Sequence, residues 1–209
     1  MPGMNDESAK PLIEARTPQL LTFGAVLVLN AFGLLTFLPV LCSFAVVSVL
    51  SFGLITFALP ALALGLATFC LPFAFGNPYV QWLARKLPRT SAPQNFLVQL
   101  TCRPRRASGP RGVLEDADDI GWLGVTDSQL EFNGDSFSLR IPKAHISEIR
   151  RQSIGWRGLF LTHRTVVRAD GLEGMDTLEF TERASRLLPQ SRRMGCELHK
   201  ALEAWTSHA

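Results

Sequence analysis

Residues 121–134 read Gly-Trp-Leu-Gly-Val-Thr-Asp-Ser-Gln-Leu-Glu-Phe-Asn-Gly, and they predict two short β-strands joined by a turn. Apolar and aromatic residues fill the first half, and apolar and polar residues alternate in the second half, as on half-buried strands. Asp127 and Ser128 between the halves favour the turn. A second turn follows at 133–135, because Asn-Gly is a strong hairpin signal. The stretch therefore predicts antiparallel β-structure.

Similar patterns lie on both sides of this hairpin. Short runs rich in Val, Ile, Leu and Phe are separated by turn residues, and Gly134, Gly171 and Gly174 mark some of the turns. In all we predict about seven short strands. Beyond the hairpin itself, the expected strands are 96–102, 137–141, 145–151, 159–161 with 165–168, and 176–180.

The C-terminal end has a different period. Met194, Leu198, Ala201, Leu202 and Trp205 recur at intervals of three or four residues. This spacing places them on one face of a helix, so we expect an amphipathic helix after the last strand.

The order of these elements resembles a pleckstrin-homology-like (PH-like) domain, in particular the GRAM and bacterial membrane-associated types. The resemblance covers residues from about 96 to 206, and 152–174 carry the least of it. It implies a mainly-β domain, a seven-stranded bent barrel capped by a C-terminal helix, that serves as a binding or scaffolding platform and performs no chemistry. The residues that carry it are 121–127, 130–132, 139–142, Ile146 and Ile149.

The N-terminal third has another character, because 17–84 contain no Asp, Glu, Lys or Arg. About 20 consecutive apolar residues are enough to cross the hydrocarbon core of a bilayer. We therefore predict a transmembrane helical hairpin, with helices near 20–41 and 47–71. The turn between them is short and uncharged, which leaves open whether the hairpin spans fully or is re-entrant. Two membrane segments are favoured over three.

The flanks of the apolar run predict an orientation. Basic residues stand at both ends, and positive charge near membrane helices favours the cytoplasmic side. Tyr79 and Trp82 occupy the position of an interfacial aromatic belt, beside the interfacial cations Arg85 and Lys86. We thus expect an integral protein of the inner or plasma membrane, with a soluble domain in the cytoplasm.

The predicted fold class is therefore a membrane α-helical hairpin followed by a mainly-β soluble domain of PH-like type. The expected divisions are a disordered tail (1–17), the hairpin (18–78), a basic juxtamembrane linker (79–95) and the PH-like domain (96–209).

Four arginines form the main candidate for an anion- or lipid-binding site: Arg103, Arg105, Arg106 and Arg111. Guanidinium groups suit phosphate oxygens, and the resemblance implies lipid headgroups at a loop in this position. A solvated basic loop is the alternative. The acidic run 115–119 offers oxygen ligands for a hard cation but lacks EF-hand spacing, so we expect solvated carboxylates and no metal site there.

Composition narrows the class of function. The formal net charge is +3, and the part after the apolar run carries both signs in similar number, which does not suit a nucleic-acid-binding protein. The four cysteines form no CxxC pair, and the four histidines lie apart. No nucleophile motif or glycine-rich phosphate loop is present. We expect no catalytic residue and no cofactor.

The sequence as a whole predicts a membrane-anchored binding or scaffold module, not an enzyme. Its partner would be a protein or the anionic surface of a lipid membrane. The alternative is a structural assembly protein that self-associates through its apolar hairpin.

Overall fold

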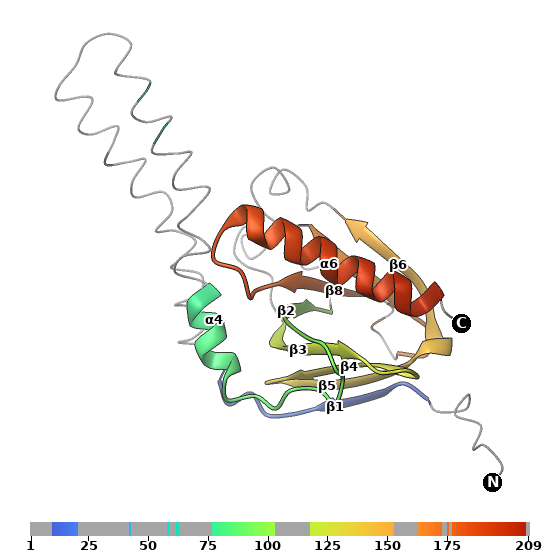
Figure 1. Ribbon diagram of the computed structural model, residues 1–209. Helices are drawn as coiled ribbons and strands as arrows, with labels where there is room; N and C mark the ends of the chain where they lie inside the picture. The colour runs from blue at the N-terminus through green and yellow to red at the C-terminus, as the bar shows by residue number, and fades with distance from the viewer. Residues whose placement is uncertain are drawn as a thin grey trace.

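The computed structural model describes residues 10–20, 42, 58, 62, 77–102, 118–152, 163–172, 175 and 177–207. In these residues eight strands form one antiparallel sheet, and two helices pack against it (Figure 1). The elements are β1 (Leu12–Ala15), α4 (Asn77–Ala84), β2 (Asn95–Thr101), β3 (Asp119–Val125), β4 (Gln129–Gly134), β5 (Phe137–Pro142), the 3-10 turn η4 (Lys143–His145), β6 (Ile146–Gln152), β7 (Arg164–Ala169), β8 (Thr177–Glu182) and α6 (Leu188–Ser207).

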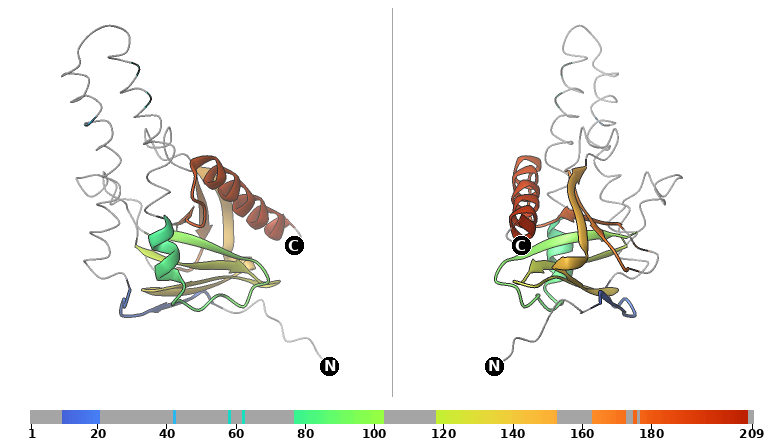
Figure 2. Two further views of the ribbon diagram at one scale, coloured as in Figure 1. Left: turned by 60° about the vertical axis from the view of Figure 1, so that its left-hand side comes forward. Right: turned by 90° about the vertical axis from the view of Figure 1, so that its right-hand side faces the viewer.

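The strands are ordered β1-β5-β4-β3-β2-β8-β7-β6. Consecutive strands from β2 to β5 pair as hairpin neighbours, as do β6 to β8, and β2 joins the two sets by pairing with both β3 and β8. The sheet bends at this junction, so that β1 and β3–β5 form one layer and β6–β8 turn away from it (Figures 1 and 2). Helix α6 packs against β6, β7 and β8.

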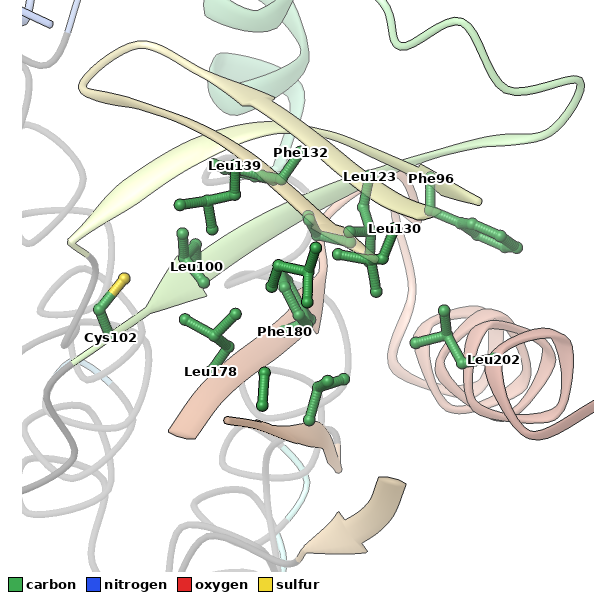
Figure 3. Packing of buried hydrophobic residues seen from close by; sticks show 14 of the residues in the cluster. Phe96, Leu100, Cys102, Leu123, Leu130, Phe132, Leu139, Leu178, Phe180 and Leu202 are labelled. Atoms are coloured by element: carbon green, nitrogen blue, oxygen red, sulfur yellow. The ribbon is translucent and has the colours of Figure 1, made fainter. Parts of the chain in front are cut away.

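The main core lies inside the bend. Successive side chains of a strand point to opposite faces, so Phe96, Val98 and Leu100 of β2 all point to this side. There they pack with apolar residues of every strand from β3 to β8. Leu198 and Leu202 of α6 close it, and both are 1% exposed. Figure 3 shows these side chains converging from both layers and from the helix. Burial of this apolar surface is the main force that holds the two layers together.

A smaller cluster lies on the opposite face of β2 and β3. Leu97 and Ile120 point away from the main core and pack against Val80 and Ala84 of α4. Within the described residues α4 spans Asn77–Ala84, and Asn77, Val80, Leu83 and Ala84 are its buried residues. Both faces of β2 are thus covered, which explains why six of its seven residues are buried.

Two glycines allow close approaches that a side chain would prevent. A Cβ at Gly134 would collide with the Asp119 carboxylate, and one at Gly124 would lie 2.5 Å from the Ala92 Cβ. The first lets the β4–β5 turn close over Asp119, and the second lets the segment before β2 cross β3.

The structure corrects the predicted fold class in the number of strands. The expectation was seven strands, with residues 1–17 disordered, but Leu12–Ala15 of that tail form β1 and pair with β5. Ile13 packs against the main core from β1. A strand of four residues beside a mixed polar tail carries too little periodicity to be recognised in the sequence.

The structure also overturns the predicted membrane hairpin and, with it, the predicted integral-membrane localisation and cytoplasmic orientation. In the described part of the chain, no helix is both long and apolar enough to cross a membrane. The two predicted spans lie outside the described residues, apart from Leu20, Ala58 and Leu62. The last part of the apolar run has a different role: Val80, Leu83 and Ala84 of α4 are buried in the protein. Hydropathy does not distinguish burial against a sheet from burial in lipid.

The boundary between predicted linker and predicted domain is also different. The linker prediction began at residue 79, but α4 extends to Ala84 and packs on the sheet through Val80. The segment that follows is held as well, since the Thr90 N–H donates to Asn95 Oδ1 (2.9 Å) and the Ser91 N–H donates to Glu131 Oε2 (3.0 Å).

Candidate binding surface on helix α4

The predicted site residues have two different outcomes. Arg103, Arg105, Arg106 and Arg111 lie outside the described residues. Tyr79, Trp82, Arg85 and Lys86 are described, and they lie on α4 and the turn after it. We call these four residues the α4 patch.

Helical spacing brings the aromatic rings of the α4 patch together. Tyr79 and Trp82 are three residues apart, and their rings stack with centroids 6.0 Å apart and planes inclined by 18°. Lys86 lies four residues after Trp82, and its Nζ is 4.8 Å from the centroid of the indole ring. Trp82 is nevertheless 51% exposed, and among the described residues it is the one aromatic side chain in the group of exposed large hydrophobic residues. The patch therefore presents a flat ring flanked by a phenol and an ammonium group.

Side-chain hydrogen bonds fix α4 on the sheet. The buried Asn77 amide donates to the Ser185 carbonyl (2.7 Å), and the Gln81 amide donates to the Ala184 carbonyl (2.6 Å). At the other end, Trp122 Nε1 donates to the Ala84 carbonyl (3.1 Å), which also accepts the Leu87 N–H (3.1 Å). The patch is thus carried by a helix anchored to β3 and to the segment after β8.

The charge around the α4 patch has one sign. Residues 77–95 contain no Asp or Glu, while Arg85, Lys86 and Arg89 are all exposed. None of the three forms a salt bridge with another described residue. The Arg89 guanidinium carbon is 4.9 Å from the ring centroid of Trp122, so a second cation–aromatic pair lies just beyond the first. The surface is suited to an anionic partner.

A second polar cluster surrounds the β4–β5 turn. Asp119 has no exposed surface, and its carboxylate accepts four backbone N–H groups, from Ile120 (2.8 Å), Asp135 (3.0 Å), Ser136 (2.9 Å) and Phe137 (2.8 Å). Burial raises the pKa of Asp119 to about 6, and the four hydrogen bonds only partly offset this effect. The prediction that this acidic run is solvated is therefore wrong at Asp119.

The same turn holds the N-terminal segment. The Asp135 carboxylate accepts the backbone N–H groups of Gln19 (3.1 Å) and Leu20 (2.8 Å), and the Arg16 N–H donates to the Ser136 carbonyl (2.7 Å). A cavity of about 330 Å³ opens beside these contacts. Its lining comes from Ala15, Arg16, Pro18, Cys102, Asp118, Ser136, Phe137 and Met175.

The residues on either side of the arginine-containing segment line this cavity and are hydrogen-bonded to each other. Cys102 and Asp118 flank residues 103–117, and the Cys102 N–H donates to Asp118 Oδ2 (2.8 Å). The Asp118 N–H in turn donates to the Leu100 carbonyl (3.0 Å). Asp118 is thus engaged in holding the two chain ends together, which is a structural role.

Sequence reasoning placed weight on the α4 patch but missed Asp119 and Asp135. The Asn-Gly-Asp turn at 133–135 was visible, yet three of the four N–H donors to Asp119 and both N–H donors to Asp135 described above are 16 or more positions away. Among the described residues, no group of three His, Cys, Asp or Glu side chains is placed to hold a metal ion. Comparison of the chain with protein-family models, with curated proteins and with solved structures found no match.

Proposed function

We propose that this protein is a binding module of PH-like type, not an enzyme, and that its α4 patch docks on the anionic surface of a lipid bilayer. The succession of seven strands, β2 to β8, and the helix α6 supports the PH-like assignment. The docking proposal needs side-chain contact with a lipid surface only and does not require a membrane-spanning helix.

The observation that carries the proposal is Trp82, half exposed between a stacked Tyr79 ring and the Lys86 ammonium group. Tryptophan and tyrosine favour the headgroup layer, because each combines an apolar ring with one polar group. Lysine and arginine beside them attract phosphate, and each contributes about 1 kcal/mol near an anionic surface. The α4 patch combines both features on one helix.

An acidic protein surface is the competing partner. We favour the lipid surface because α4 lies on the outer side of the sheet (Figures 1 and 2) and presents its exposed ring from one short helix. Such a surface suits a flat, fluid partner that needs no shape-matched pocket.

The test is flotation of the full-length protein with two kinds of vesicle, phosphatidylcholine alone and phosphatidylcholine mixed with phosphatidylglycerol. We expect preferential, salt-sensitive binding to the mixed vesicles. Removing two charges with Arg85→Gln and Lys86→Gln should weaken that preference about 10- to 30-fold. Trp82→Ala should weaken binding to both kinds of vesicle.

A matched control removes two exposed charges elsewhere, with Arg192→Gln and Lys200→Gln on α6. This control should bind like the wild type. Equal loss in both double variants would show a general charge effect and contradict a role of the α4 patch. Binding to polyglutamate without any preference for the mixed vesicles would instead assign the patch to an acidic protein partner.

A further inference from the structure

The two edge strands of the sheet differ in length. At one end is β1, with four residues, and at the other is β6, with seven, most of them exposed. Among the described residues, only β7 pairs with β6. The outer side of an edge strand presents backbone N–H and C=O groups that can pair with another strand.

Strand β6 lacks two common protections against such pairing. It contains neither proline nor glycine, and its one irregularity lies between Ile146 and Glu148, at its start, which leaves 148–152 regular. Helix α6 packs across the inner side of β6, β7 and β8 (Figure 2). It therefore does not cover the outer edge of β6. Ile149 faces that inner side and packs against the main core.

The side chains on the other face of β6 carry alternating charge. Glu148 and Arg150 are two residues apart and therefore share a face, and Arg150 Nη1 lies 4.0 Å from Glu148 Oε1. Their side chains are 48% and 55% exposed. Both charges are thus available to a strand laid beside β6.

Symmetry restricts how a second β6 could pair with the first. A two-fold axis perpendicular to a sheet keeps side chains on their own face, so it must pass midway between a residue and the copy of that residue on the partner strand. An axis between the two copies of Ile149 places Glu148 opposite Arg150 twice, within the regular part of the strand. An axis at Glu148 or at Arg150 would place like charges opposite each other, which is destabilising.

We propose that the protein forms a two-fold dimer in which β6 of one copy pairs antiparallel with β6 of a second copy, centred on Ile149. The charge pattern matches this occupant, because in this register the exposed Glu148 and Arg150 of one strand lie opposite Arg150 and Glu148 of the other. This surface is separate from the α4 patch, which lies at the other side of the sheet (Figure 1).

The test is a charge exchange followed by sedimentation velocity of the full-length protein. Glu148→Arg places two arginine pairs in opposition, and Arg150→Glu places two glutamate pairs in opposition. Each variant alone should therefore dimerise at least about tenfold more weakly than the wild type. An equimolar mixture should form a heterodimer, because every opposed pair is then oppositely charged. The double variant should dimerise again by itself.

Arg192→Glu on α6 is the matched control, since it makes the same change of charge at an exposed residue outside β6 and should leave the dimer intact. Circular dichroism establishes that each variant is folded. A monomeric wild type at all concentrations would overturn the proposal. So would single variants that dimerise like the wild type, or folded single variants whose mixture fails to associate.

Discussion

At the scale of a single residue, Asp119 links burial to pH. Its folded-state pKa of about 6 is above the ordinary value of 3.8, because burial penalises the ionised carboxylate. The folded chain therefore binds more protons than the unfolded chain between these two pH values. The stabilisation associated with this group is present below about pH 4 and is lost as the pH rises through about 6. Each pKa unit corresponds to about 1.4 kcal/mol, so the loss is about 3 kcal/mol.

Asp119→Asn removes this titration and leaves two of the four backbone N–H groups facing an amide that cannot accept them. We expect the variant to be less stable than the wild type at pH 4, and we expect the gap in free energy of unfolding to narrow by up to about 3 kcal/mol at pH 7. Urea unfolding at both pH values measures this gap. Asp127→Asn, at an exposed turn, is the control. A gap that widens with pH would show that the hydrogen bonds outweigh burial.

At the scale of an element, β1 depends on a few contacts for its place in the sheet. Among the described strands it pairs only with β5, through four residues, and the chain after it is held by the Asp135 carboxylate at Gln19 and Leu20. A short edge strand is expected to open locally more easily than the core strands. Because hydrogen bonds to a charged group contribute about 1.5–3 kcal/mol, Asp135 is a principal restraint on that opening.

Asp135→Ala should therefore raise the hydrogen-exchange rate of the Leu12–Ala15 amides by about tenfold or more, with little change in β2 or β8. The backbone N–H of residue 135, which donates to Asp119, is kept in this variant. Asp127→Ala serves as the comparison. Unchanged exchange in β1 would mean that strand pairing with β5 alone holds it.

At the scale of the whole molecule, the two layers share one core and are joined through β2. Phe132 of β4 and Phe180 of β8 meet across the bend with ring centroids 6.1 Å apart, and neither side chain is exposed. A shared core of this kind predicts that the layers unfold together.

Phe180→Ala should cost about 3–5 kcal/mol of stability while leaving a single unfolding transition. Far-ultraviolet circular dichroism and tryptophan fluorescence should report the same midpoint in urea. Phe137→Ala, at a half-buried position beside the cavity, should cost clearly less. Two separate transitions in the Phe180 variant would show that the layers are independent folding units.

The sequence determined the grouping of the α4 patch but not its setting. Tyr79, Trp82 and Lys86 are spaced by three and four residues, so any helix here brings them to one side. That α4 packs on β2 and β3 depends on contacts with residues about 100 positions away, such as the hydrogen bond from Asn77 to Ser185. The arginines at 103, 105, 106 and 111 remain a prediction, since they lie outside the described residues.

The sequence by itself determined the strands β2 to β8 and the helix α6, because their apolar periods of two and of 3.6 residues are local properties that the main core then uses. Only the tertiary structure decided which strands are neighbours, that Leu12–Ala15 extend the sheet, and that Asp119 is buried under a turn. The same is true of the end of the apolar run. Hydropathy predicts that Val80 and Ala84 avoid water, and only the packing of α4 shows that they are buried against a β-sheet.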